Sequence, residues 1–117
     1  MHILYIEDEP NDAALVERFV RSTPHRLTIA PTLQAAYHAI QHAPDIVLVD
    51  ILLGQTRQGF SFINEMRQSG FTKPIIVITG LTMPEDIEAC YTCGCNDVLT
   101  KPYVITDLAR VLTNYLA

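Results

Sequence analysis

The sequence predicts an α/β fold in which helices cover both faces of a five-stranded parallel sheet. Short apolar runs alternate with amphipathic stretches along all 117 residues. Two of these runs, residues 46–49 and 74–78, are continuously apolar, which is typical of strands buried on both faces. Strict alternation of strands and helices favours right-handed crossovers and therefore a parallel sheet.

The expected elements follow one another from the N-terminus to the C-terminus. Strands are expected at residues 2–6, 27–30, 46–49, 74–78 and 97–100. Within the stretches between them, apolar residues recur at helical spacing, as in Leu15, Val16, Phe19 and Val20. Helices are therefore expected between residues 11 and 24, over residues 33–42, 60–69 and 84–93, and from about residue 106 onward.

Capping residues support these helix boundaries. Asn11 or Asp12 is expected to cap the first helix, and Thr32 the second, because their side chains accept hydrogen bonds from free backbone N–H groups. Gly70 and Gly94 are expected to end the third and fourth helices, because glycine tolerates the conformation that follows a helix C-terminus.

The two continuously apolar strands are expected inside the sheet. This placement fits the doubly wound order 2-1-3-4-5, which we take by analogy from flavodoxin-like folds. The expected architecture is a (βα)5 three-layer sandwich, and residues 1–117 are expected to form a single domain.

Composition and charge exclude several functional classes. Thirteen acidic and eight basic residues give a net charge of −5, which argues against a nucleic-acid-binding surface and against a basic membrane-surface helix. No apolar run approaches the roughly 20 residues of a membrane-spanning helix. Acidic residues from Glu7 to Glu9 interrupt any signal-peptide pattern, so a cytoplasmic location is expected.

The chain has three cysteines, Cys90, Cys93 and Cys95. An odd number in one cluster does not suit a disulfide framework. Cys90 and Cys93 have the spacing of zinc ligands, but a structural zinc site needs four ligands and no second cluster follows. Reduced thiols that pack near a helix end are therefore expected.

Polar residues gather where the expected strands end. Glu7 and Asp8 follow the first strand, Asp50 the third, Thr79 the fourth and Lys101 the fifth. Carboxylates brought together in this way favour a hard divalent cation such as Mg²⁺. A threonine and a lysine facing a metal-bound carboxylate suit an incoming phosphoryl group, with Asp50 as its nucleophile.

Each of these residues has a simpler interpretation when taken alone. The acidic stretch from Glu7 to Glu9 could precede a helix N-terminus, Asp50 and Thr79 could form turns, and Lys101 could be a surface lysine. Their joint placement at four strand ends argues against these alternatives.

At this point the sequence resembles the receiver domain of two-component response regulators over essentially all 117 residues. Four motifs carry the resemblance: Ile-Leu-Tyr-Ile-Glu-Asp-Glu-Pro (3–10), Asp-Ile-Val-Leu-Val-Asp (45–50), Lys-Pro-Ile-Ile-Val-Ile-Thr-Gly (73–80) and Gly-Cys-Asn-Asp-Val-Leu-Thr-Lys-Pro-Tyr (94–103). The resemblance implies a signalling domain rather than an enzyme, whose phosphoryl donor is a histidine kinase or a histidine phosphotransfer protein.

The resemblance also implies a role for each site residue. Asp50 is implied as the phosphoacceptor, Thr79 as the switch hydroxyl and Lys101 as the phosphate-contacting lysine, with a cis bond between Lys101 and Pro102. The ligands of Mg²⁺, or of Mn²⁺ in its place, are implied to be Glu7, Asp8, Asp50 and the backbone carbonyl of Leu52.

The sequence departs from the family pattern at three places. Val98 replaces the aromatic switch residue that the family carries three positions before the lysine. Gly59 lies nine residues after Asp50 instead of eight, so the intervening loop is one residue longer. Leu52 and Leu81 stand where polar groups could orient an attacking water, which predicts a long-lived phosphoaspartate.

Other functions remain as alternatives. A degenerate receiver that acts as a phosphorylation-independent interaction module is the main one, favoured by Val98 and the altered loop. A flavodoxin-like electron carrier would need a phosphate loop rich in Ser, Thr and Gly where this chain has acidic residues. A haloacid-dehalogenase-type phosphatase would need an Asp-x-Asp pair after the first strand, which is absent. On the first helix, Leu15 and Val16 either meet the phosphodonor or belong to the core.

Overall fold

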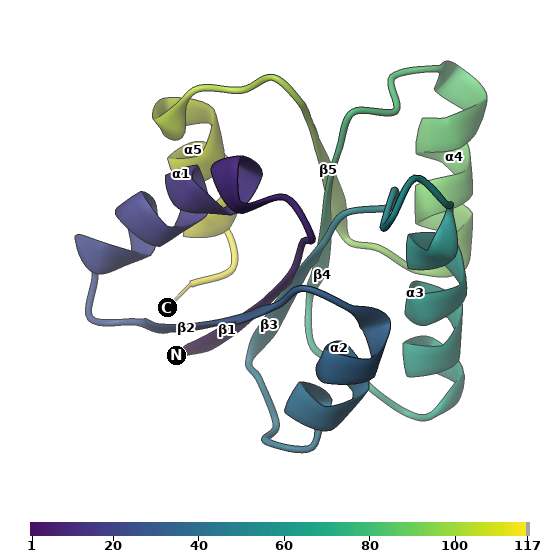
Figure 1. The fold of residues 1–117 in the computed structure, drawn as a ribbon, viewed down its shortest axis with the longest axis horizontal. Coiled ribbons are helices and arrows are strands. Elements are labelled where there is room, and N and C mark those ends of the chain that lie inside the picture. The colour runs from purple at the N-terminus through teal and green to yellow at the C-terminus, as the bar shows by residue number, and fades with distance from the viewer. Residues whose placement is uncertain (117) are drawn as a thin grey trace.

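The computed structural model describes residues 1–116, and within this range five strands alternate with five helices (Figure 1). The strands are β1 (His2–Ile6), β2 (Arg26–Ala30), β3 (Ile46–Val49), β4 (Ile75–Thr79) and β5 (Asp97–Thr100). The helices are α1 (Pro10–Arg21), α2 (Leu33–Ile40), α3 (Gln58–Gln68), α4 (Pro84–Cys93) and α5 (Ile105–Thr113). The strands pair in parallel in the order β2-β1-β3-β4-β5, so the predicted fold class and strand order are confirmed.

The sheet separates two cores. Helices α1 and α5 lie on one face, and α2, α3 and α4 lie on the other (Figure 1). Successive side chains of a strand point to opposite faces, so each interior strand contributes to both cores. In β1, Leu4 and Ile6 join the core under α2, α3 and α4, whereas Ile3 and Tyr5 join the core under α1 and α5. This double burial explains the continuous apolar runs of the interior strands.

The first helix begins earlier than the sequence predicted. Its N-cap is Glu9, whose side chain accepts a hydrogen bond from the backbone N–H of Asn11 at 3.2 Å. The expected cap at Asn11 or Asp12 is therefore wrong, because Pro10 occupies the first helical position, where its fixed φ and missing N–H are tolerated. The cap predicted for α2 is confirmed, since Thr32 accepts a hydrogen bond there.

The three cysteines are free thiols near the C-terminal end of α4. Cys90 and Cys95 are buried and Cys93 is half-buried, as expected for packing thiols. Within residues 1–116, the cysteines do not form a cluster of three or more metal-ligating side chains. Over the same range, the longest apolar helical stretch falls short of what a membrane span requires.

Candidate functional site

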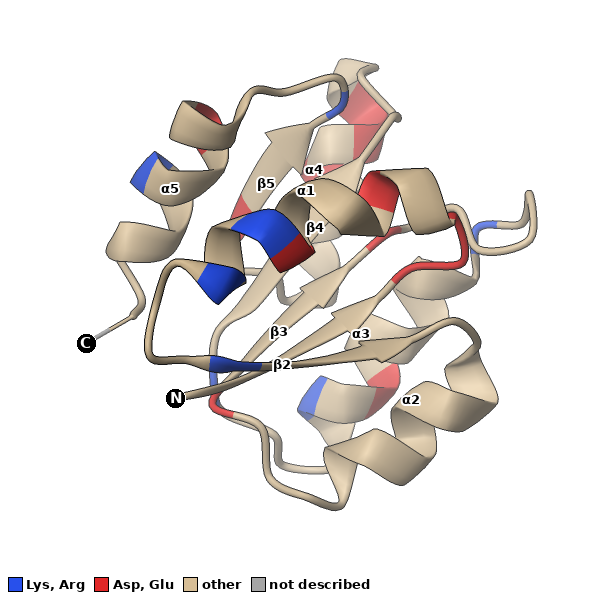
Figure 2. Ribbon diagram, turned by 60° about the vertical axis from the view of Figure 1, so that its left-hand side comes forward, with Lys and Arg blue, Asp and Glu red and all other residues tan. Residues whose placement is uncertain are grey.

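The carboxyl ends of four strands bring polar side chains to one edge of the sheet. Glu7 follows β1, Asp50 follows β3, Thr79 ends β4 and Lys101 follows β5. Figure 2 shows the acidic segments after β1 and β3 beside one another at this edge. The arrangement follows from the parallel sheet, in which neighbouring strands end on the same side.

The ammonium of Lys101 lies at the centre of the site. Its Nζ donates to Glu7 Oε1 at 2.5 Å, to Asp12 Oδ2 at 2.8 Å and to Asp50 Oδ2 at 2.8 Å. Glu7 and Asp50 are only 2% and 5% exposed. Buried carboxylates without a partner would be costly, so the ammonium compensates for charges that water does not reach.

Asp12 is the residue of this cluster that the sequence analysis missed. It lies in the first turn of α1, and its side chain reaches Lys101 while remaining 42% exposed. An acidic residue in the first turn of a helix is common because it complements the helix dipole. The residue type alone therefore did not indicate that Asp12 belongs to the site. The useful signal was Pro10, since a helix that begins there places Asp12 inside the first turn instead of at the cap or before it.

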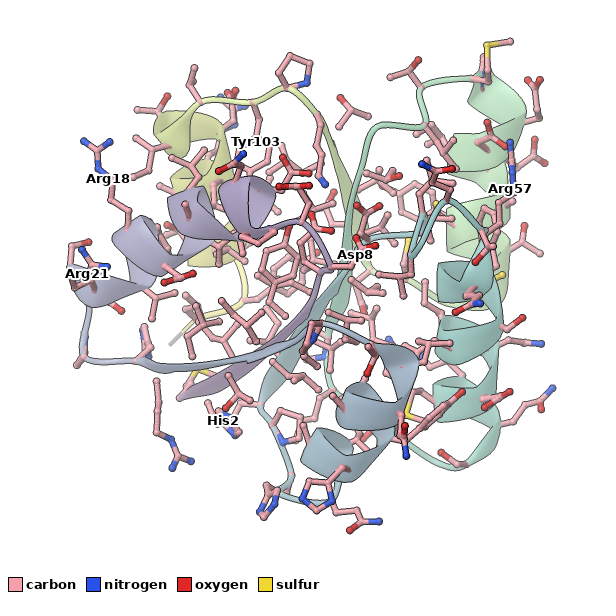
Figure 3. The ribbon with its side chains drawn as sticks, in the orientation of Figure 1. His2, Asp8, Arg18, Arg21, Arg57 and Tyr103 are labelled. Atoms are coloured by element: carbon pink, nitrogen blue, oxygen red, sulfur yellow. The ribbon has the colours of Figure 1, made fainter. Side chains whose placement is uncertain are left out.

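Two of the predicted metal ligands contact the loop after β3. Asp8 lies between α1 and the loop that carries Arg57 (Figure 3), and its Oδ2 accepts from the backbone N–H of Gly54 at 2.7 Å. Asp50 Oδ1 accepts from the backbone N–H of Leu52 at 3.0 Å. The structure thus brings Asp50 and Leu52 together, whereas Asp8 is directed to the loop and not to Lys101.

The surroundings shift the pKa values of two site residues. Burial raises the pKa of Glu7 to about 7; the bond from Lys101 opposes this shift and the carboxylate of Asp50 adds to it. For Lys101, burial lowers the pKa, but the bonds to Asp12, Asp50 and Glu7 outweigh burial and hold the pKa above its ordinary value. Lys101 therefore stays charged near neutral pH.

The donor set fits a hard divalent cation. Glu7, Asp12 and Asp50 each offer a carboxylate oxygen, and these oxygens lie within 4.8 Å of one another. Glu7 Oε2 is buried and has no hydrogen-bond partner among residues 1–116, so it is available to a ligand. Carboxylate oxygens are the ligands that Mg²⁺ prefers. Asp8 lies outside this cluster because its carboxylate is bonded to Gly54.

Thr79 is fully buried at the end of β4. Its Oγ1 accepts a hydrogen bond from the backbone N–H of Leu81 at 3.2 Å. A hydroxyl that accepts in this way keeps its own proton for a second partner. At the position of the family's aromatic residue, Val98 is half-buried and packs against the core under α2, α3 and α4.

The longer loop after β3 contains a tight turn. Leu53 and Thr56 exchange two backbone hydrogen bonds of 2.9 and 3.1 Å, and between them Gly54 and Gln55 have φ values of 59° and 66°. The loop then returns to the strand at Gly59, whose N–H donates to the carbonyl of Ile51 at 3.0 Å. The turn accommodates the extra residue without breaking this return contact.

A pocket of about 400 Å³ opens beside Lys101. It is lined by Asn11, Asp12, Leu15, Lys101, Pro102 and Tyr103. Val16 is fully buried in the core, which confirms the core alternative for this residue. Leu15 lines the pocket, and its contact with a phosphodonor stays a prediction. The bond between Lys101 and Pro102 is cis, as the resemblance implied.

Comparisons with known proteins give one consistent result. The family model described as the response regulator receiver domain matches residues 3–113. An uncharacterised 14.6 kDa protein of Leptolyngbya boryana is 29% identical, over 98% of this chain and 89% of its own length. The transcriptional regulatory protein RprY of Bacteroides fragilis is 27% identical, over 92% of this chain. The match spans 46% of RprY, so this chain corresponds to about half of that relative.

Solved structures agree on the fold. NtrX from Brucella abortus matches with a TM-score of 0.89 and 26% identity, over 98% of this chain and 26% of that chain. The N-terminal receiver domain of RstA from Klebsiella pneumoniae matches with a TM-score of 0.88 and 22% identity, over 98% of this chain and 97% of that chain. CheY4 of Vibrio cholerae gives 0.87 and 22%, over 98% of both chains. The last two likenesses concern the fold alone.

Proposed function

The chain belongs to the response regulator receiver domain family of two-component signalling, and from this membership we propose that Asp50 accepts a phosphoryl group. The donor is a histidine kinase or a histidine phosphotransfer protein, and the step depends on Mg²⁺, which Mn²⁺ can replace. Residues 1–117 act as one receiver domain, and phosphorylation switches a surface that binds another protein. Relatives such as RprY are about twice as long, so the output of this chain is part of the proposal.

One observation carries this proposal. Asp50 is 5% exposed, and its carboxylate is held from both sides, by the ammonium of Lys101 at 2.8 Å and by the backbone N–H of Leu52 at 3.0 Å. Two donors on the two oxygens fix the orientation of the carboxylate at the end of β3. An oriented carboxylate beside a cation is the arrangement required of a phosphoryl-accepting nucleophile.

Phosphoryl transfer to Asp50 is a single displacement at phosphorus, in which one bond forms and one breaks. A carboxylate oxygen of Asp50 forms a bond to phosphorus, and the phosphorus–nitrogen bond of the donor phosphohistidine breaks with its electron pair left on nitrogen. Lys101 then pairs with one phosphoryl oxygen and the hydroxyl of Thr79 donates to another. Mg²⁺ would be held by Glu7, Asp50 and the carbonyl of Leu52, and by Asp8 once its carboxylate turns from the Gly54 N–H toward Asp50. The ion would supply further positive charge for the phosphoryl oxygens.

The experiment is intact mass spectrometry after incubation with acetyl phosphate, with and without Mg²⁺. A gain of one phosphoryl group is expected only with Mg²⁺, and the matched variant Asp50→Asn should show none. Binding of fluoroberyllate, followed by ¹⁹F NMR, gives a second readout that does not depend on the phosphodonor. Failure of both readouts in the folded protein would contradict the proposal and favour the phosphorylation-independent interaction module.

A further inference from the structure

Lys101 uses all of its hydrogen-bonding capacity in this structure. An ammonium has three N–H donors, and Nζ of Lys101 contacts three carboxylates, on Glu7, Asp12 and Asp50. To contact a phosphoryl oxygen on Asp50, the ammonium must therefore give up at least one of these bonds. Which bond it gives up decides how easily the phosphorylated state forms.

Asp12 differs from the other two carboxylates. Glu7 and Asp50 are almost fully buried, and both already have proposed roles in metal binding or phosphoryl transfer. Asp12 comes from α1, is 42% exposed, and lines the pocket that opens beside Lys101. It holds the ammonium from the solvent side of the site.

We propose that Asp12 is a positioning residue that restrains Lys101 and thereby limits how readily Asp50 takes a phosphoryl group. The inference rests on the proposed function. The bond from Lys101 to Asp12 stabilises the unphosphorylated protein, because it occupies a donor that the phosphoryl group needs. The carboxylate of Asp12 also adds negative charge beside the place where an anionic group must arrive.

The carboxylate of Asp12 should affect binding of the metal cation and binding of the phosphoryl group in opposite directions. A divalent cation is attracted by each carboxylate near Glu7 and Asp50, so loss of the Asp12 charge weakens metal binding. An anionic phosphoryl group competes with Asp12 for Lys101, so the same loss strengthens its binding. A purely structural role in the first turn of α1 would weaken both or neither.

The test compares Asp12→Asn with Asp12→Glu and with Glu17→Gln. Glu17 is an exposed acidic residue of the same helix, so its variant removes a charge of the same sign away from Lys101. Fluoroberyllate affinity is measured by ¹⁹F NMR at saturating Mg²⁺, in about 0.5 M salt to screen direct repulsion. Metal affinity is measured separately, by the paramagnetic resonance of free Mn²⁺.

Asp12→Asn should bind fluoroberyllate about three- to fivefold more tightly than the wild type, as expected for loss of a partly exposed ion pair. The same variant should bind Mn²⁺ more weakly. Asp12→Glu should stay near the wild type because it keeps the carboxylate, and Glu17→Gln should change neither constant. An unchanged or weaker fluoroberyllate affinity in Asp12→Asn would overturn the inference. If the wild type itself binds no fluoroberyllate and gains no phosphoryl group, the proposed function fails, and this inference with it.

Discussion

Arg57 and Asp86 join the loop after β3 to helix α4. Figure 3 shows Arg57 beside α4. Its guanidinium donates to the carboxylate of Asp86, a residue in the first turn of α4, at 2.6 Å. The side chain of Arg57 is 56% exposed and that of Asp86 is 12% exposed. The same loop is bonded to Asp50 through Leu52. A short chain of contacts therefore connects the phosphoacceptor to α4 without using Val98.

Replacing Arg57 by glutamine tests this connection. Arg57→Gln should lower the free energy of unfolding by about 1 kcal/mol. Arg57 is largely exposed but its partner Asp86 is mostly buried, so the ion pair is worth more than a fully exposed one. The variant should also reduce the change in amide hydrogen exchange that fluoroberyllate produces in residues 84–93. Urea denaturation and hydrogen exchange with mass spectrometry give the two measurements.

The matched control for Arg57 is Arg110→Gln. Arg110 pairs with Asp107 at 3.0 Å on α5, where both side chains are more exposed. This variant should leave stability and the exchange of α4 nearly unchanged. If α4 responds to fluoroberyllate equally in Arg57→Gln and in the wild type, the loop does not transmit the signal through Arg57.

Leu52 and Leu81 predict a slow loss of the phosphoryl group. Both are half-buried and apolar, and neither side chain offers a group that could orient a water for attack on phosphorus. The phosphoaspartate should therefore persist well beyond seconds in Mg²⁺ buffer. Leu81→Gln should shorten its lifetime by about tenfold, since an oriented water reacts faster. Intact mass followed over time measures both, and a half-life of seconds in the wild type would contradict the interpretation.

Gly59 allows close packing of α3 against the chain that carries Asp50. A Cβ added at Gly59 would lie 2.5 Å from the Cα of Ile51 and 2.6 Å from the carbonyl oxygen of Asp50. Gly59→Ala should therefore cost about 1–3 kcal/mol of stability through overpacking. At Gly80, no atom of the described residues lies within 4 Å of an added Cβ, apart from the glycine itself and its two chain neighbours. Gly80→Ala should accordingly be neutral or stabilise by up to about 1 kcal/mol, and equal destabilisation by both variants in urea titrations would contradict the packing argument.

The sequence was sufficient to predict those residues whose positions depend on the apolar periodicity and on the strand topology. Continuous apolar runs predicted the interior strands, and the parallel sheet then brought Glu7, Asp50, Thr79 and Lys101 to one edge. No side-chain contact was needed for that inference, because the ends of parallel strands coincide. The roles assigned to these residues stay predictions until the phosphorylation experiment is made.

The sequence was insufficient to predict those residues whose positions depend on where a helix begins or on the path of a loop. The place of Asp12 depends on whether α1 begins at Pro10 or two to three residues later. The cap predicted at Asn11 or Asp12 put Asp12 outside the first turn or at its edge, so its contact with Lys101 was not expected. The pair of Arg57 and Asp86 joins residues 29 positions apart. The pair also depends on the path of the loop, which takes a tight turn at Gly54 and Gln55. The spacing between Asp50 and Gly59 predicted that the loop is one residue longer, but it did not predict the direction that the loop takes.

The thiols provide a test of the fold that is independent of phosphorylation. Burial raises the pKa of all three thiols, that of Cys90 to about 11 and that of Cys95 to about 12, so at pH 8 few of them are ionised. The half-buried Cys93 should therefore react first with iodoacetamide, and the rate should rise with pH because the thiolate is the nucleophile. Intact mass at pH 8 should show one fast label in the folded protein and three in urea. Cys93→Ser should remove the fast label, whereas two or three fast labels in the folded protein would contradict the packing of α4 against the sheet.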